Sequence, residues 1–80
     1  MKIEILGMGC AKCAALVANV EAVVKELGIS AEVVKVSDLA TIANYGVMMT
    51  PALVVDGTVK STGKALKREE IRKVLQDAQQ

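Results

Sequence analysis

The sequence predicts a small α/β domain whose strands and helices follow the order β-α-β-α-β-β-α. Two short β-prone runs, at residues 2–6 and 31–36, enclose a stretch with helical periodicity. An Asp56-Gly57 pair separates two further β-prone runs, and the chain closes on a second amphipathic stretch. Eighty residues are enough for one domain with a small core, and we expect residues 1–80 to form it as a unit.

The first strand and the first helix follow from two different periodicities. In residues 2–6, Ile3 and Ile5 alternate with polar neighbours, as in a short strand. In residues 11–27 the apolar side chains recur at the spacing of one helix face, and Gly28 is placed to cap the C-terminus. The residues of this face are Leu16, Val17, Val20, Val23, Val24 and Leu27.

The next two elements are a strand at residues 31–36 and a short helix at 39–45. The valines of the strand predict burial on more than one side. Because a helix joins this strand to the first, the two should be parallel, with a right-handed crossover. Ser37 or Asp38 can cap the short helix, and Gly46 ends it.

A hairpin and a helix form the last part of the prediction. Asp56-Gly57 between the runs 52–55 and 58–60 is a strong turn signal, so these strands should be antiparallel. Combined with the parallel pair, they predict a four-stranded mixed sheet flanked by helices. The segment 68–79 carries its apolar side chains on one helix face, namely Ile71, Val74, Leu75 and Ala78.

The composition excludes several classes of function. The net charge is +1 and Tyr45 is the one aromatic residue, which argues against a nucleic-acid-binding surface. Histidine is absent, which excludes a Cys-His dyad and any metal site that contains histidine. Neither a signal-peptide pattern nor a membrane span is visible, so we expect a cytoplasmic protein without a membrane partner. Basic residues are dense between positions 60 and 73, and acidic neighbours favour a solvated surface there.

Both cysteines lie between the first strand and the first long helix. Cys10 and Cys13 form a C-x-x-C pair in a loop that Gly7 and Gly9 loosen. The N–H groups at a helix N-terminus lack intrahelical partners, and the helix dipole favours negative charge there, so thiolate chemistry is expected. A loop closed between Cys10 and Cys13 would be too small to staple the fold. The pair therefore indicates either a redox dithiol or a two-thiolate metal clamp.

Two motifs, together with the order of elements, resemble one known family. Residues 9–13 hold the C-x-x-C after the first strand, and residues 50–57 hold a Thr-Pro pair that opens the hairpin. The chain resembles the small thioredoxin-like redox-active disulfide proteins of archaea and bacteria, over essentially its whole length. The resemblance implies a minimal thioredoxin fold. It also implies a thioredoxin-like disulfide reductase or electron carrier that reduces or exchanges protein disulfides.

The resemblance assigns roles to residues near the cysteine pair. Cys10 would be the attacking thiolate, with a pKa below the usual value of about 8.5, and Cys13 would resolve the mixed disulfide. Lys12 and Gly9 would modulate the pair. No cofactor or metal is implied apart from the redox-active disulfide Cys10–Cys13.

The resemblance also assigns roles to the Thr-Pro turn. Pro51 would be cis and lie against the C-x-x-C, and Thr50 would offer its backbone to an extended substrate segment. Met8, Met48 and Met49 could form an apolar rim for a protein partner, although core packing is nearly as well supported for Met48 and Met49. The implied partners are a protein disulfide substrate and an upstream reductase, with no nucleic acid, and we expect a monomer.

Other interpretations remain open at this point. Residues 7–13 also fit the G-M-x-C-x-x-C loop of heavy-metal-associated domains, which would make the chain a carrier of Cu(I) or a similar soft ion. That family closes on a strand and gives Pro51 no role. A thioredoxin fold could also serve as a redox-sensing regulatory module. Whether Glu4 corresponds to the buried carboxylate of thioredoxins is not settled by the alternation of its strand.

Overall fold

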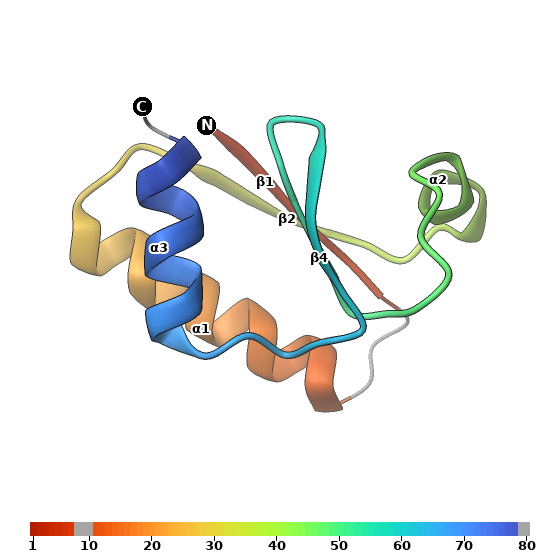
Figure 1. Ribbon diagram of the computed structural model, residues 1–80, viewed down its shortest axis with the longest axis horizontal. Helices are drawn as coiled ribbons and strands as arrows, with labels where there is room; N and C mark the ends of the chain where they lie inside the picture. Colours follow the sequence, from red (N-terminus) through yellow and green to blue (C-terminus); the bar gives the residue numbers. More distant parts are fainter. Residues whose placement is uncertain (8–10, 79–80) are drawn as a thin grey trace.

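The predicted order of elements is confirmed in the computed structural model, which describes residues 1–7 and 11–78 (Figure 1). The boundaries agree with the predicted ones to within one or two residues. The elements are β1 (Lys2–Leu6), α1 (Ala11–Leu27), β2 (Glu32–Val36), α2 (Leu39–Asn44), β3 (Ala52–Val55), β4 (Thr58–Thr62) and α3 (Arg68–Ala78). None of these helices is long and apolar enough to cross a membrane.

The four strands form one mixed sheet in the order β2-β1-β3-β4. β1 pairs parallel with β2 and antiparallel with β3, while β3 and β4 form the predicted antiparallel hairpin. The hairpin turn is made by Asp56 and Gly57, both with positive φ, as a tight two-residue turn requires. β1 therefore lies between β2 and β3, and its C-terminal end lies on the side of the molecule where α1 begins (Figure 1).

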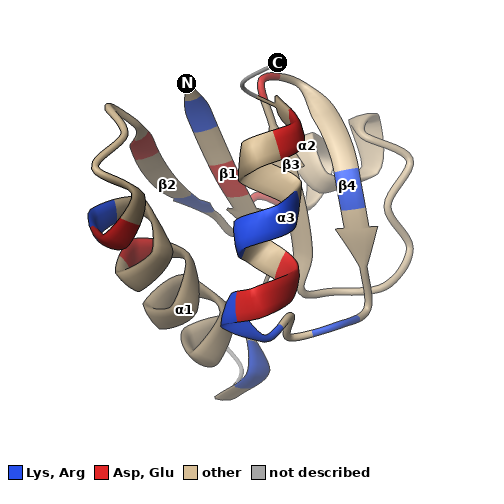
Figure 2. Ribbon diagram, turned by 60° about the vertical axis from the view of Figure 1, so that its left-hand side comes forward, with Lys and Arg blue, Asp and Glu red and all other residues tan. Residues whose placement is uncertain are grey.

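Helices cover the two faces of the sheet unequally. α1 and α3 lie over one face and α2 lies on the other side (Figure 2). Alternation along β1 sorts its side chains: Ile3 and Ile5 pack with α1 and α3, whereas Leu6 packs with Ile42 of α2. The result is a larger core under α1 and α3 and a smaller core beside α2.

The burial predicted for the second strand is only partly met. β2 is an edge strand, so one of its sides has no neighbouring strand. Val33 contacts the larger core and Val36 contacts the smaller one, but both remain partly exposed, as does Val34. A run of valines is thus compatible with an edge position, where both faces touch apolar side chains without being covered.

The helix ends agree with the predicted caps. Gly28 has φ +64° after α1, the left-handed conformation that glycine adopts at helix C-termini. Asp38 caps α2, accepting hydrogen bonds from the Thr41 N–H (3.2 Å) and the Thr41 hydroxyl (2.7 Å). The hydroxyl, followed by the N–H, lowers the pKa of Asp38 below its usual value of 3.8. Tyr45 is the C-terminal cap of α2, so the helix ends one residue earlier than predicted.

Candidate functional site

Cys13 lies in the first turn of α1 with a side chain only 6% exposed. The thiol that the resemblance assigns as the resolving one is therefore buried. No acidic residue occupies the first turn, so the partial positive charge of the helix N-terminus is not offset there. Lys12 is exposed on the same turn. Cys10, Gly9 and Met8 lie outside the described residues.

Gly7 forms the contact surface on which Cys13 rests. Its N–H donates to the carbonyl of Val36 (2.9 Å), which continues the ladder between β1 and β2 by one residue. A Cβ atom added to Gly7 would collide with Cys13 Sγ and would lie 3.3 Å from Cys13 Cβ and 4.0 Å from Pro51 Cα. Gly7 thus lets the thiol approach the backbone closely, beside Pro51.

The register of β1 and β3 explains why Pro51 reaches this point. Leu6 pairs with Ala52, so the next residues outward, Gly7 and Pro51, face each other across the strand ends. The Thr50-Pro51 peptide bond is cis, as the sequence resemblance implies. Pro51 is buried, and its carbonyl accepts a hydrogen bond from the Gly63 N–H (2.8 Å). The turn before β3 is therefore tied to the segment that follows β4.

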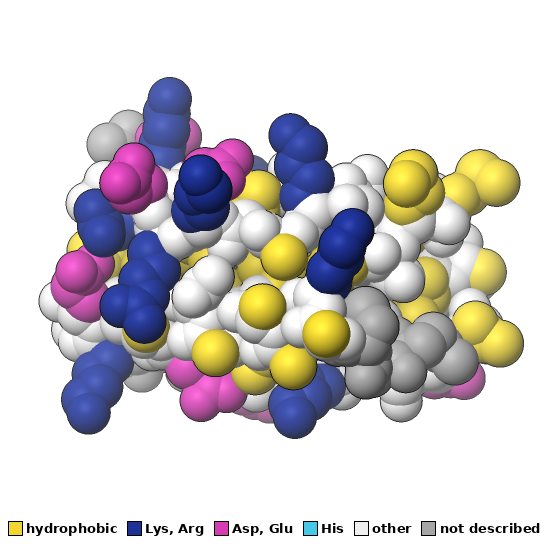
Figure 3. Space-filling model, turned by 90° about the horizontal axis from the view of Figure 1, so that it is seen from below, with side chains coloured by type: hydrophobic (Ala, Val, Ile, Leu, Met, Phe, Trp, Pro, Cys, Tyr) yellow, Lys and Arg dark blue, Asp and Glu magenta, His cyan; other side chains and the backbone are white. Residues whose placement is uncertain are grey.

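The two methionines before this turn are on the surface. Met48 is 96% exposed and Met49 is 64% exposed, so the structure does not place them in the core. Met49 lies over Gly63, with its Cβ and Cε atoms 3.3 Å from the position that a Gly63 Cβ would occupy. Hydrophobic side chains project from the end of the molecule that carries α2 (Figure 3). Thr50 is half-buried, and the surface next to it is consequently apolar.

On the other side of β1, a buried carboxylate meets a partly buried tyrosine, a contact that the sequence analysis did not predict. Glu4 is only 8% exposed, and the Tyr45 hydroxyl donates to its Oε1 atom at 2.7 Å. This hydrogen bond, then burial and the negative charge of Glu4, raises the pKa of Tyr45 above its usual value of 10.0. Since Glu4 alternates with Ile3 and Ile5, it faces α2 and points away from the face that α1 covers. The signals in the sequence were an acid inside an apolar strand and a single aromatic residue.

The structure brings four of the predicted site residues to the same end of the sheet. Cys13 and Pro51 meet around Gly7, and Met49 and Thr50 border the same turn. In the part of the chain that the structure describes, no three His, Cys, Asp or Glu side chains are grouped as metal ligands.

Comparison with known proteins agrees with this arrangement. The thioredoxin domain family matches residues 1–76. A protein named thioredoxin from Methanothermobacter thermautotrophicus is 45% identical over 75 residues, which cover 94% of this chain and 97% of the relative. A second protein named thioredoxin, from Methanocaldococcus jannaschii, is 44% identical over 73 residues, covering 91% of this chain and 84% of the relative. The chain therefore belongs to the thioredoxin domain family.

Proposed function

We propose that this protein is a thiol-disulfide oxidoreductase that reduces or exchanges disulfides of partner proteins. The observation that carries the proposal is the position of Cys13, buried in the first turn of α1 against Gly7 and beside Pro51, in a chain of the thioredoxin family. Cys10 is three residues earlier, and it supplies the second thiol of the pair. The working cofactor is the Cys10–Cys13 disulfide itself.

The proposed reaction consists of two thiol-disulfide exchanges. The Cys10 thiolate attacks one sulfur of the partner disulfide, which forms a mixed disulfide and releases the first partner thiolate. The Cys13 thiolate then attacks Cys10 Sγ, which forms the Cys10–Cys13 disulfide and releases the second partner thiolate. The partner gains two electrons, and after protonation of its thiolates it carries two thiols. An upstream reductase must return two electrons and two protons to regenerate the dithiol.

The surroundings suggest how each thiol is prepared. The partial positive charge at the N-terminus of α1 favours the thiolate of Cys10, with exposed Lys12 adding a weaker and salt-sensitive contribution. Gly9 puts no side chain directly before Cys10, where an approaching partner would meet it. Cys13 is buried, which suits a resolving thiol because it limits exchange with disulfides other than the mixed disulfide at Cys10.

The turn before β3 is the proposed docking position for the substrate. Thr50 would offer its backbone to an extended segment, in the manner of a short added strand, while Pro51 holds this backbone next to Cys13. Met49 would contribute adaptable apolar contact beside it. Main-chain recognition of this kind tolerates different substrate sequences. The proposed partners are protein disulfides and the upstream reductase, with the chain acting as a cytoplasmic monomer.

The metal-carrier hypothesis has no support from the fold or the family. Heavy-metal-associated domains close on a strand, whereas this chain closes on α3, and the family match extends through that helix as far as residue 76. A regulatory role for the same dithiol would use the same chemistry, and no observation in the structure favours it over catalysis.

A redox titration of the cysteine pair tests the proposal most directly. We expect one two-electron transition between roughly −300 and −120 mV, the span of known couples of this kind. The Cys10→Ser variant should lose disulfide reduction, whereas Cys13→Ser should accumulate a mixed disulfide with the substrate protein. The matched control is the double variant, which should trap nothing. Failure of the two thiols to form an intramolecular disulfide, together with tight Cu(I) binding, would overturn the proposal.

A further inference from the structure

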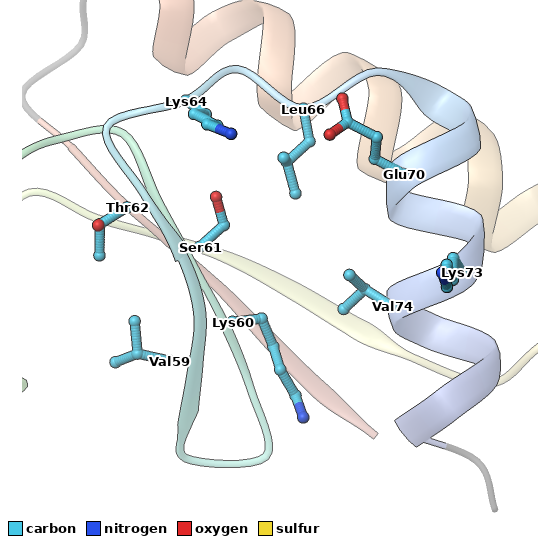
Figure 4. Close-up of a pocket in the computed structure, with 9 residues that line it drawn as sticks. All are labelled: Val59, Lys60, Ser61, Thr62, Lys64, Leu66, Glu70, Lys73 and Val74. Atoms are coloured by element: carbon cyan, nitrogen blue, oxygen red, sulfur yellow. The ribbon is translucent and has the colours of Figure 1, made fainter.

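A second surface feature lies on the α3 side of the sheet, between β4 and α3. It is an open hollow of about 690 Å³ (Figure 4). Its lining residues are Val59, Lys60, Ser61, Thr62, Lys64, Leu66, Glu70, Lys73 and Val74. We call this feature the β4–α3 groove.

The groove exists because α3 does not cover the edge of the sheet. α3 packs chiefly on α1, which leaves the outer strand β4 without a helix over it. The pairing of β3 with β4 also shifts, since Val54 pairs with Val59 but Leu53 pairs with Ser61. Lys60 is thus an extra residue in a bulge, and the shift turns Ser61 toward α3.

The floor of the groove is fixed by contacts with α1. Leu66 is buried, and its carbonyl accepts a hydrogen bond from Asn19 Nδ2 at 3.1 Å. Val74 projects from α3 toward β4 on the other side of the groove (Figure 4). The floor is therefore apolar and is held in place by both long helices.

The rim of the groove is basic. Lys60, Lys64 and Lys73 come from β4, from the connecting segment and from α3 (Figure 4), and all three are exposed. Within residues 1–7 and 11–78 there is one ion pair, between Arg72 and Glu26. None of these lysines therefore has a carboxylate partner within 4 Å in that part of the chain. Glu70 is the single acid of the lining, and its Oε1 atom accepts a hydrogen bond from the Lys67 N–H at 3.1 Å. The groove has three ammonium groups against one engaged carboxylate.

We propose that the β4–α3 groove binds an extended acidic segment of the protein whose disulfide is exchanged. Charge complementarity selects the acidic chemistry, and the spread of the lysines over three segments favours an elongated occupant over a small anion. A second copy of the chain is a poor occupant, because its own groove carries the same positive charge and the bulge with Lys60 hinders pairing of two β4 edges. The shortage of aromatic side chains argues against a single-stranded nucleic acid.

One end of the groove lies next to the turn before β3. Its lining residues Thr62 and Lys64 flank Gly63, whose N–H donates to the Pro51 carbonyl and over which Met49 lies. A segment bound in the groove would therefore leave it at the turn beside Cys13. Only the statement that the occupant belongs to a disulfide partner rests on the proposed function. The preference for acidic peptides is a property of the groove itself.

The binding test uses peptides without cysteine. A short peptide of alternating Glu and Thr is compared with the same peptide containing Gln in place of Glu, by NMR titration of the labelled full chain. We expect shifts at Ser61, Thr62 and Val74, with about tenfold tighter binding of the Glu peptide at low salt, because exposed charge pairs contribute modestly and additively. This preference should disappear at about 0.5 M salt.

Matched charge variants separate the groove from the overall charge of the protein. One variant carries Lys60→Gln, Lys64→Gln and Lys73→Gln, and the control carries Lys2→Gln, Lys25→Gln and Lys35→Gln, all at exposed positions. Both lose three positive charges. The groove variant should lose about tenfold in affinity for the Glu peptide, whereas the control should lose less than about twofold. Equal losses in the two variants, or shifts outside the groove, would overturn the proposal.

A kinetic test distinguishes this proposal from the proposed function. Two peptide disulfides that differ only in a Glu-rich or Gln-rich flank are reduced by the wild-type protein. The acidic substrate should have about tenfold higher kcat/KM, and the groove variant should remove this difference without changing the rate for the neutral substrate. Equal rates for both substrates would refute the groove proposal while leaving the oxidoreductase intact. Binding of the Glu peptide without reduction of either substrate would refute the proposed function alone.

Discussion

The contact of Gly7 with Cys13 predicts a large effect of adding a single methyl group. Gly7 does not have positive φ, so alanine suits its backbone and the cost of Gly7→Ala is steric. The new Cβ would collide with Cys13 Sγ and would lie 3.3 Å from Cys13 Cβ, so the side chain of Cys13 or the backbone beside it has to shift. Overpacking of this kind costs about 1–3 kcal/mol. In a domain of this size, about 2 kcal/mol lowers the melting temperature by roughly 8–16 °C.

The assay is a double-mutant cycle with Cys13→Ala, followed by urea unfolding. If the collision with Sγ causes the loss, Gly7→Ala should cost about 2 kcal/mol in the wild-type background and less than about 1 kcal/mol without the sulfur. Gly28→Ala is the matched control, because Gly28 has φ +64° and open space around it. It should destabilise the fold without coupling to Cys13. Equal losses from Gly7→Ala in the two backgrounds would refute the steric explanation.

Three further predictions concern single side chains. Tyr45→Phe should destabilise the fold, because it leaves the buried carboxylate of Glu4 without its hydrogen bond. Since the pKa of Tyr45 is raised in the fold, the stability that this hydroxyl contributes is present below pH 10 and is lost as pH rises through the raised pKa. A difference in unfolding free energy between wild type and Tyr45→Phe that stays constant up to about pH 11 would contradict this. Asp38→Ala should destabilise the fold at pH 7, because it removes the N-terminal cap of α2. Because the pKa of Asp38 is lowered from 3.8, this stability is present above pH 3.8 and is lost as pH falls through the lowered pKa; acid unfolding curves of both proteins check the sign. Met48→Ala should lower the free energy of unfolding by less than about 0.5 kcal/mol and yet weaken partner binding. A large loss of stability with unchanged binding would show a packing role.

Local patterns predicted the elements well because each element has a strong local cause. The bounds of α1 matched, since its apolar period is regular and Gly28 ends it with a left-handed residue. The hairpin matched because Asp56 and Gly57 accept positive φ. β4 is longer than predicted, reaching Thr62 in place of residue 60, because a bulge at Lys60 breaks the alternation that marks a strand.

Contacts between distant residues were beyond reach of local patterns. The hydrogen bond between Glu4 and Tyr45 joins residues 41 positions apart, and neither residue type demands such a partner. The same is true of Gly7, which in the sequence only loosens a loop but in the fold makes space for a sulfur atom. The alternative positions of Met48 and Met49 were also undecided, since exposure depends on what covers a loop.

The geometry of the site depends on the register between β1 and β3, and the hairpin turn holds that register from the far end. Pro51 faces Gly7 only while Leu6 pairs with Ala52, and a slip by one residue would turn the side chains of β3 from one core to the other. At the other end, the Asp56 N–H donates to the Lys2 carbonyl and the Lys2 N–H donates to Asp56 Oδ1, both at 2.8 Å. A turn residue at the opposite end of the pair therefore fixes the alignment that brings the proline to the thiol. The hairpin and the cysteine segment are remote in sequence, but they position the same site.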